Sequence, residues 1–438
     1  YRQLTMLGLP IVIGQLGSIV LAFADTLMIG HHSTAELAAA AFVNNMFNLV
    51  IIFALGFSYA ITPTVGTLYG QCKTGRIGEV VKNGIIANIM MAAALVAVMA
   101  VFYACIGYMG QPRELLPYIR PYFLVLLASL PFVCLFNVFQ PFADGMTGMA
   151  LSMWVVICGN ILNICGNWVL IYGKLGAPEM GIVGAGTSTL ISRIVMAAAM
   201  AGIFFTKRKY REYARGCREG HVNRRDFTYL CKLGAPIALQ MGMETAAFSL
   251  TSIVVGWIGT TALAAHQVML TISQLGFMVY YGFGAAAAVR ISNAVGQKDW
   301  KAARANAYAA LQIVLAIGVV VSIAVFALRY QLGGLFTDST DVVRLVAMTV
   351  IPFVVYQFGD AMQIIFGNSL RGLSYVRPLV LFAFIAYFVV SLPMSYLFGI
   401  VMGFGLEGVW ASFPFGLTTA GVLYLMAFRR RLDYIENR

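Results

Sequence analysis

The stretch LGAPIALQMGMETAAFSLTSIVVG, residues 233–256, decides the fold, because it is long enough to cross a bilayer as a helix and carries one charge, Glu244, near its middle. An acid at the centre of a membrane helix costs about 2.5–3.5 kcal/mol on insertion scales. Such acids therefore face a bundle interior or a wet cavity, and they often mark ion or substrate paths. Glu244 is thus a candidate functional residue, and a protonated glutamate that hydrogen-bonds a neighbouring helix is the alternative.

The same stretch shows that the chain is an internal repeat. Its opening residues 233–236, LGAP, match residues 7–10, LGLP, and the same offset then aligns Gly256 with Gly30 and Gly296-Gln297 with Gly70-Gln71. Similar composition alone would not keep one register through two helices and the loop after them. A second pair, FADGMTG at 142–148 and FGNSLRG at 366–372, extends the repeat. The chain is therefore predicted to consist of two halves.

Composition places the chain in a membrane. Of its 438 residues, 60% are hydrophobic and only 11% are charged, whereas about a quarter of the residues of a soluble domain are charged. The net charge of +12 comes from basic residues in short loops, which the positive-inside rule explains without nucleic-acid binding. The seven cysteines show no paired metal-ligand spacing.

Twelve segments are long and apolar enough to span a bilayer, which predicts an all-α integral membrane protein. They divide into an amino-terminal six-helix lobe (1–206), a basic linker (207–228) and a carboxy-terminal six-helix lobe (229–438). The predicted spans are 4–30, 36–69, 83–109, 115–141, 150–172, 183–206, 229–257, 263–294, 305–331, 342–367, 377–400 and 405–428.

The basic residues predict the orientation. One set of loops carries most of the Lys and Arg, including the linker, Arg371, Arg377 and the tail at 429–431, and this set is expected to face the cytoplasm. Both termini and the linker then lie inside. Because each half has an even number of spans, the halves run parallel, which is a known repeat arrangement of transporters.

Three acids lie deep in apolar segments: Asp25, Glu244 and Asp360. They are not repeat-equivalent, since Asp25 aligns with Thr251 and Glu244 with Ser18. A purely structural acid would be expected in both copies, so the asymmetry favours function. Tyr356 lies four residues before Asp360 on the same helical face and can supply an oxygen or hold the carboxylate. A ring that packs and satisfies its hydroxyl elsewhere is equally compatible.

Other polar residues inside the spans are candidates for a cavity lining. Asn160, Asn163 and Asn167 form one stripe at helical spacing, which we expect to face Asp25, with simple interhelical hydrogen bonding as the alternative. His266 can relay protons, although a lone histidine on an alanine-rich helix is more often a packed residue.

Two further features carry less weight. Arg193 lies inside the sixth span, where a cation needs a partner that the sequence does not identify. His32 and Glu36, one helical turn apart, give only a weak metal signal, and no metal site is predicted from them.

Five motifs resemble those of the multidrug and toxic compound extrusion (MATE) family, in its bacterial NorM-like branch. They occur in family order across both halves: LGLPIVIGQ with FADTLMIGH, LGAPIALQMGMETAAF, TTALAAHQV, YGFGAAAAVRISNAVGQ and YQFGDAMQIIFGNSLRG. The resemblance covers essentially the whole chain. It implies two six-helix lobes around a central cavity, alternating access, and export of amphipathic organic cations in exchange for Na+ or H+.

The resemblance also implies roles for individual residues. Asp25 matches the acid of the first helix, Asn163 and Asn167 match polar positions of the fifth helix, and Glu244, Asp360 and Tyr356 match the cation site of the second lobe, where Na+ can bind transiently. The fifth helix reads NICGN, without the proline often found in that motif, so a bend near Asn163 is not implied. The expected setting is a monomer in the lipid of a bacterial inner membrane, without a resident cofactor.

Two other functions are alternatives to export: a sugar-lipid flippase and a membrane enzyme. A related flippase of lipid-linked sugars usually has more helices and a strongly cationic cavity, which twelve spans and three buried acids disfavour. An integral-membrane enzyme, from a different class, would need a nucleophile or metal constellation near the surface, and the sequence offers only the His32 and Glu36 pair.

Overall fold

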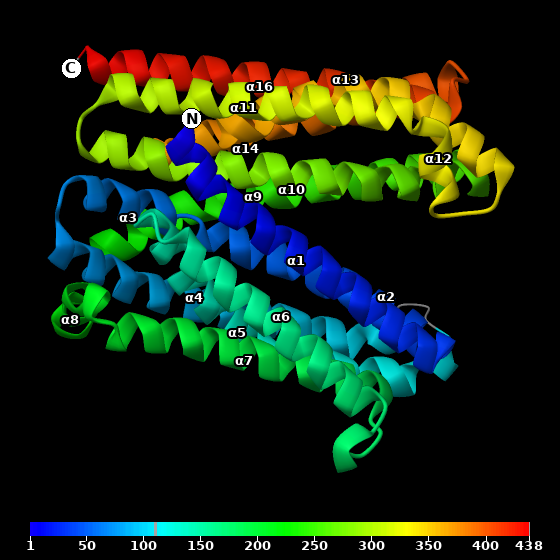
Figure 1. Cartoon of the computed structure of the whole chain (residues 1–438), viewed down its shortest axis with the longest axis horizontal. Coiled ribbons are helices and arrows are strands. Elements are labelled where there is room, and N and C mark those ends of the chain that lie inside the picture. Colours follow the sequence, from blue (N-terminus) through cyan, green and yellow to red (C-terminus); the bar gives the residue numbers. More distant parts are fainter. Residues whose placement is uncertain (109–111, 438) are drawn as a thin grey trace. The chain divides into compact units, whose positions relative to one another are not determined.

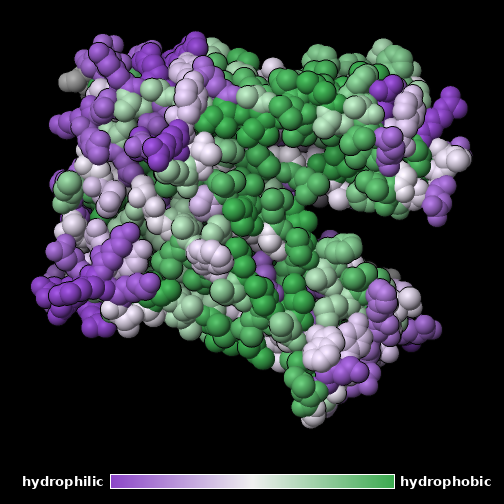
Figure 2. Space-filling view, in the orientation of Figure 1, coloured by the Kyte–Doolittle hydropathy of each residue, from purple (hydrophilic) through white to green (hydrophobic). Residues whose placement is uncertain are grey.

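The computed structural model describes residues 1–108 and 112–437, and it confirms the all-α prediction. Within these residues twelve helical segments are long and apolar enough to cross a membrane, and no strand is present (Figure 1). Figure 2 shows hydrophobic side chains along the middle of the helices and hydrophilic side chains gathered at their ends. This is the distribution that a bilayer imposes on spanning helices.

The first six spans are built from the helices α1 to α7 and short connecting turns. Their bounds are α1 Arg2–His32, α2 Thr34–Ser58, α3 Ile61–Gly70, α4 Thr74–Cys105, α5 Leu116–Gly145, α6 Met149–Ile171 and α7 Gly181–Thr206, followed by α8 Arg211–Glu219 and then α9 Arg224–Ile258, which begins the second half. The second span is broken at Tyr59 and Ala60, so α2 and α3 together make up the long segment predicted at 36–69.

The remaining spans follow without a large interruption. They are α10 Thr260–Gly296, α11 Trp300–Ala327, the short α12 Arg329–Gly334, α13 Thr340–Gly372, the composite α14 Arg377–Phe384 and α15 Leu392–Tyr396, and α16 Gly405–Glu436. The composite span includes two π-helical runs, Ile385–Ser391 and Leu397–Val401. π-Helical turns are rare, and they frequently occur at functional sites.

Two compact units make up the chain. Residues 13–238 form one, called here the Asp25 unit, and residues 1–12 with 239–438 form the other, called the Glu244 unit. The division falls inside α1 and α9 and not in the connections between helices. The lobe boundaries proposed from the sequence, 1–206 and 229–438, remain a prediction about repeats and do not coincide with these units.

The ends of α5 and α13 have the same local structure. α5 ends at Gly145 and α13 ends at Gly372, and two residues later Thr147 and Ser374 have φ of 61° and 55°. A Cβ at Gly145 would lie 2.9 Å from the carbonyl oxygen of Thr62, and one at Gly372 would lie 2.7 Å from that of Ala288. Only glycine fits such a close approach.

This equivalence corrects the repeat alignment. The sequence comparison paired Gly148 with Gly372, but the structure pairs Gly145 with Gly372, which shifts the register by three residues. Asp144 is therefore the counterpart of Arg371, since the carbonyl of each accepts the turn hydrogen bond from the residue with positive φ, at 2.9 and 2.8 Å. The two halves carry opposite charges at this position.

The predicted linker contains a helix, α8, that packs against α4. α8 packs on α4, with Ala214 and Cys217 buried in the contact. A Cβ at Gly78 of α4 would overlap the carbonyl oxygen of Tyr213, so glycine is required there. Lys82 Nζ also donates to the carbonyl of Gly220 at 2.8 Å. Burial in this contact raises the pKa of the Cys217 thiol, which reduces its thiolate fraction.

We predict that Gly78→Ala separates α8 from α4, because the added methyl group meets backbone atoms that cannot turn away. In protein that keeps Cys217 as its sole cysteine, a maleimide should label Cys217 slowly in the parent and at least about tenfold faster in the Gly78→Ala variant, since opening restores the thiol's ordinary exposure and pKa. Gly75→Ala is the matched control, because a Cβ at Gly75 meets no atom within 4 Å. Equal labelling rates in both variants would contradict the docked arrangement.

Candidate functional site

Glu244 is held by a network of amides in the Glu244 unit. Gln240, one helical turn earlier on α9, donates through Nε2 to Glu244 Oε2 at 3.1 Å. Gln363 of α13 donates to the other carboxylate oxygen at 3.3 Å. Gln240 and Gln363 are only 3% exposed. The carboxylate is thus oriented by two neutral donors, which fix its position without neutralising its charge.

Arg371 completes this network, and sequence reasoning missed it. The sequence analysis assigned Arg371 to a cytoplasmic loop, but it lies in the last turn of α13 and is only 7% exposed. Its Nη2 donates to Gln240 Oε1 at 2.5 Å, and the same glutamine side chain contacts Glu244. The buried Arg371 is therefore linked to the half-buried Glu244 through one amide. The repeat did not reveal Arg371 as a candidate site residue, because the sequence alignment paired Arg371 with the neutral Thr147 and not with the acid Asp144.

Asp360 lies on α13 next to this network. It is 2% exposed, and it is within electrostatic reach of Glu244 and of the Tyr280 hydroxyl. Among the described residues no hydrogen bond reaches Asp360 Oδ2. The buried Gln363 Oε1 likewise has no partner within the described part of the chain, whereas the Tyr387 hydroxyl lies beside Glu244. Buried polar atoms are nearly always paired, so a group of unpaired oxygens fits a place where a cation binds.

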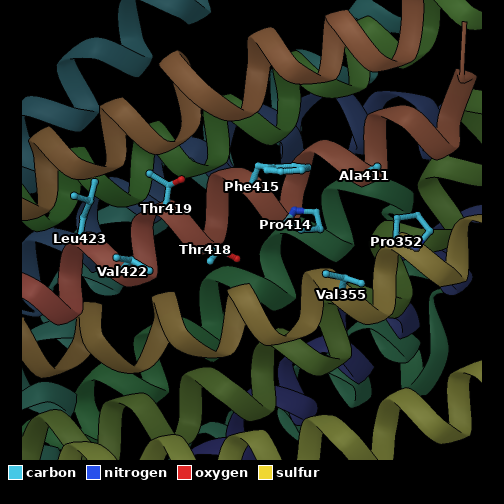
Figure 3. Close-up of a pocket in the computed structure, with 9 residues that line it drawn as sticks. All are labelled: Pro352, Val355, Ala411, Pro414, Phe415, Thr418, Thr419, Val422 and Leu423. Carbon is cyan, nitrogen blue, oxygen red and sulfur yellow. The ribbon is translucent and has the colours of Figure 1, made fainter. Parts of the chain in front are cut away.

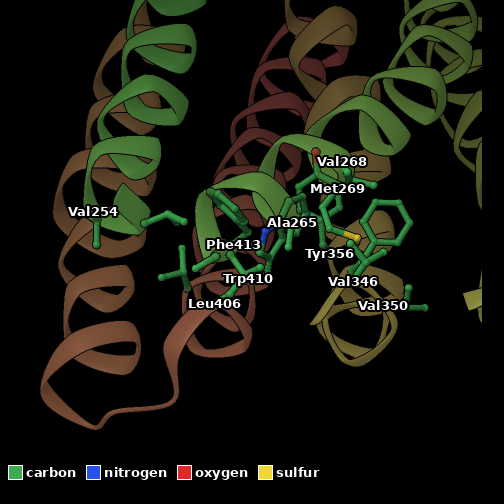
Figure 4. Close-up of a cluster of buried hydrophobic side chains, with 14 of the residues drawn as sticks. Val254, Ala265, Val268, Met269, Val346, Val350, Tyr356, Leu406, Trp410 and Phe413 are labelled. Atoms are coloured by element: carbon green, nitrogen blue, oxygen red, sulfur yellow. The ribbon is translucent and has the colours of Figure 1, made fainter. Parts of the chain in front are cut away.

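Tyr356 packs its ring in an aromatic cluster. The ring lies 5.6 Å from Trp410 and 5.8 Å from Phe353, measured between centroids, and Figure 4 shows it among the buried side chains of α10, α13 and α16. Its hydroxyl lies beside Ser273. No hydrogen bond joins Tyr356 to Asp360 in the described ranges, so the structure gives the ring a packing role and leaves a role in ion binding as a prediction.

His266 is fully buried, and both of its ring nitrogens form hydrogen bonds. Trp410 Nε1 donates to His266 Nδ1 at 3.1 Å, and His266 Nε2 lies 3.0 Å from Ser252 Oγ. Because an indole N–H can only donate, Nδ1 must be the acceptor, and the imidazole is the neutral tautomer with its proton on Nε2. This is the arrangement of a packed, hydrogen-bonded histidine.

Asp25 and the asparagine stripe meet in the Asp25 unit, as the sequence predicted. Asn167 Nδ2 donates to Asp25 Oδ1 at 2.5 Å. Asn163 also reaches that oxygen at 3.1 Å when its amide nitrogen faces the acid, and its oxygen then accepts from Thr189 Oγ1 at 3.1 Å. Asn160, 8% exposed, is on the same face of α6, and its Nδ2 has no partner among the described residues.

Asp25, Asn160 and Asn163 line a pocket of about 480 Å³ that lies wholly within the Asp25 unit, whereas Asn167 does not line it. Besides Asp25, Asn160 and Asn163 it is lined by Arg193, whose Nη1 donates to Ser129 Oγ at 2.6 Å. Apolar walls complete the pocket, among them Ile29, Phe47, Leu126 and Met196. The volume is typical of sites for small molecules. The structure thus gives Arg193 the surroundings that the sequence could not supply.

The predicted sites therefore fall into two groups. Glu244, Asp360 and Tyr356 lie in the Glu244 unit, and Asp25, Asn160, Asn163 and Asn167 lie in the Asp25 unit. His266 belongs to the Glu244 unit but does not line the 480 Å³ pocket.

The His32 and Glu36 pair is an ion-pair cluster. His32 Nδ1 lies 2.8 Å from Glu36 Oε2, and its Nε2 lies 3.0 Å from Glu179 Oε1. Both ring nitrogens are engaged by carboxylates, so neither has a free lone pair for a metal ion.

A second pocket is apolar. It has a volume of about 600 Å³ and lies between α13 and α16, and Figure 3 shows Val355 of α13 facing Thr418 and Val422 of α16. None of its lining residues carries a charge. In a membrane such a surface is suited to contact with lipid chains, and it has no group that could bind an ion.

Comparison with known proteins finds relatives that match this chain over nearly its whole length. The MatE family model matches residues 10–169 and 236–397. The "Probable multidrug resistance protein NorM" of Mannheimia succiniciproducens is 31% identical over 434 residues, covering 96% of this chain and 92% of that protein. The "Multidrug resistance protein NorM" of Vibrio cholerae is 29% identical and covers 96% and 93%.

Solved structures show the same fold. A transporter of the MOP superfamily from Pyrococcus furiosus superposes with a TM-score of 0.91 at 20% identity, covering 99% of this chain and 96% of that chain. At this identity the likeness is evidence about the fold alone.

We predict that His266 stabilises the fold and does not touch the transported molecule. Trp410→Phe leaves His266 Nδ1 buried without a donor, which should lower the free energy of unfolding by about 1–3 kcal/mol. His266→Leu combined with Trp410→Phe should recover part of that loss, because neither polar partner then remains. Unfolding in detergent measures stability, and binding of a fluorescent organic cation to the same samples measures affinity. A changed affinity with unchanged stability would place His266 in the binding path instead.

Proposed function

Because this chain belongs to the MatE family, we propose that it is a secondary antiporter that exports amphipathic organic cations in exchange for Na+ or H+. The family is one of multidrug transporters and not of enzymes. The observation that carries the coupling proposal is the group around Glu244 and Asp360, in which Asp360 Oδ2 and Gln363 Oε1 are buried and lack partners within the described residues. The separate acid Asp25 lines a small-molecule pocket in the other unit.

The charge of the Glu244 unit supports exchange of one monovalent cation. Two carboxylates, Glu244 and Asp360, lie within electrostatic reach of each other, and Glu244 is also within reach of one guanidinium, that of Arg371. When both acids are ionised, one negative charge is left over. In a region of low dielectric that charge requires a cation, which is either Na+ on the unpaired oxygens or a proton on one carboxylate.

Coupling requires that the ion and the organic cation bind the two conformational states of the protein with different affinities. A ligand shifts a conformational equilibrium only by its differential affinity for the two states. We propose that the ion favours one state of an alternating-access cycle and the organic cation favours the other.

The molecule would operate as a monomer in a bacterial inner membrane, with both termini in the cytoplasm. Arg371 no longer contributes to that topology argument, whereas the exposed Arg377 and the linker residues still do.

We predict that Glu244→Gln and Asp360→Asn each abolish ion-driven efflux of a fluorescent cation from proteoliposomes. The double variant should be little worse than either single variant, because the two groups act as one unit. Adding Asp25→Asn should further weaken the binding that remains. Asp338→Asn, at an exposed loop acid of the same unit, is the control. Normal uphill efflux by Glu244→Gln would show that the site is assigned wrongly.

We further predict that Arg371→Gln increases the affinity of the ion site. Removing the buried positive charge removes its competition with the incoming cation, so the Na+ concentration or H+ activity for half-maximal efflux should fall by about tenfold or more, as for one unit of pKa. A residue that only supported the fold would instead raise that concentration. Arg377→Gln is the matched control, because Arg377 is exposed and lies just beyond the end of the same helix.

A further inference from the structure

Helix α8 carries a row of arginine residues that no acid neutralises. Arg211, Arg215 and Arg218 recur at spacings of four and three residues, so they share one face of the helix, and Arg208 in the turn before α8 continues the row. All four residues are exposed. None of them forms an ion pair with an acid in the described part of the chain. These four residues are called the α8 arginine face.

The α8 arginine face is held in one orientation, because a different face of α8 is fixed against α4. Ala214 and Cys217 are buried in that contact. Just after α8, the carbonyl of Gly220 accepts a hydrogen bond from Lys82 Nζ of α4 at 2.8 Å. The helix therefore cannot rotate to bury its arginines, and they stay on the outside of the protein.

The position of α8 places this face at the level of lipid headgroups. The uncharged part of α4 begins after Lys82. Gly78, which α8 contacts, lies four residues earlier, which is about 6 Å at the rise of an α-helix. The headgroup layer on each side of a bilayer is about 5–8 Å thick. Figure 1 shows α8 at the end of the helices of its unit, and Figure 2 shows hydrophilic side chains gathered at that end.

A contact with α7 places α8 at the same level. The guanidinium of Arg218 lies over the ring of Phe205, 5.3 Å from its centroid. Phe205 is in the last turn of α7, which spans the membrane. Aromatic side chains at the ends of membrane helices lie at the headgroup level. The α8 arginine face therefore begins where the hydrocarbon of the bilayer ends.

We propose that the α8 arginine face binds anionic phospholipid headgroups of the surrounding bilayer. A guanidinium can donate two parallel hydrogen bonds to one phosphate, which an ammonium group cannot do. Clusters of basic residues next to a membrane helix attract anionic lipid, and each residue near the surface is worth about fivefold in affinity. The positive-inside rule explains the side of the membrane on which such residues lie, but it does not require one rigid face of arginines. Binding of lipid here does not depend on which molecule the protein exports.

The test measures the contact of lipid with α8 in a bilayer. Cys72 is exposed and lies within electrostatic reach of Tyr213 of α8, so a bimane group on Cys72 as the sole cysteine reports lipid beside the helix. The labelled full chain is reconstituted in phosphatidylcholine. Rising fractions of phosphatidylglycerol or phosphatidylcholine are then added, each with a quenching nitroxide on the fifth carbon of one acyl chain.

These two quencher lipids differ in headgroup charge and not in the depth of the nitroxide. Half-maximal quenching should need a mole fraction of phosphatidylglycerol at least about fivefold lower than that of phosphatidylcholine. NaCl at about 0.5 M should remove most of this preference, because it screens exposed charges. Equal quenching by the two lipids at low salt would overturn the proposal and leave the α8 arginine face as a solvated surface.

Variants locate the binding. Arg208→Gln, Arg211→Gln and Arg215→Gln combined should raise the mole fraction of phosphatidylglycerol for half-maximal quenching by about fivefold or more, without changing that of phosphatidylcholine. If this variant does not insert correctly, Arg208→Lys, Arg211→Lys and Arg215→Lys keep the charge that sets topology but lose the planar fork. They should weaken the same preference by a smaller factor, and an unchanged preference would contradict recognition by the guanidinium groups.

The matched control removes the same charge elsewhere. Lys298→Gln, Lys301→Gln and Arg430→Gln combined replace three exposed basic residues of the Glu244 unit. This variant should keep the preference for phosphatidylglycerol beside Cys72. An equal loss of preference in the control and in the α8 variant would show that net charge, and not the α8 arginine face, attracts the lipid.

Discussion

An unpaired charge inside a membrane is the constraint on which this structure depends. The amide of Gln240 joins Arg371 to Glu244, Asp360 lies within electrostatic reach of Glu244, and the charges of the three groups do not cancel when both acids are ionised. In a soluble protein, water would stabilise the remaining net charge. Here we propose that a mobile cation supplies the compensation, because the helices around the site leave the buried Asp360 Oδ2 unpaired. The same cost explains why so few charges occur in the spans and why each has a specific surrounding.

The two halves share a backbone but differ in charge. α5 and α13 end in the same turn, yet Asp144 occupies one position and Arg371 its equivalent. Asp144 accepts from Ser152 at 3.0 Å, whereas Arg371 reaches toward Glu244 through Gln240. Duplication therefore supplied two copies of one helical frame, and substitutions within that frame produced two different polar interiors. One interior contains Glu244 and Asp360, and the other contains Asp25 and Arg193, which line one pocket.

Much of this could be predicted from the sequence, because a bilayer leaves few alternatives to spanning helices. The twelve spans followed from length and hydropathy. Helical spacing gave the asparagine stripe, and the structure brings Asn167 of that stripe to Asp25, where the sequence had left simple interhelical hydrogen bonding open as the alternative. Arg371 was misplaced, because an arginine near a helix end looks like a loop residue that obeys the positive-inside rule. Gln240 could have been found, since it lies one turn before Glu244. The docking of α8 depends on Gly78, whose close contact with backbone atoms has no signature in a single sequence.

The central claim is that the ion and the organic cation are linked through one conformational equilibrium. It is tested most directly by measuring the Kd of a fluorescent organic cation for the purified chain over a series of Na+ concentrations at fixed pH, and over a series of pH values without Na+. The account predicts that the Kd rises with one of the two ions and then levels off, and that the dye weakens binding of that ion by the same factor. A Kd that is independent of both ions would contradict it.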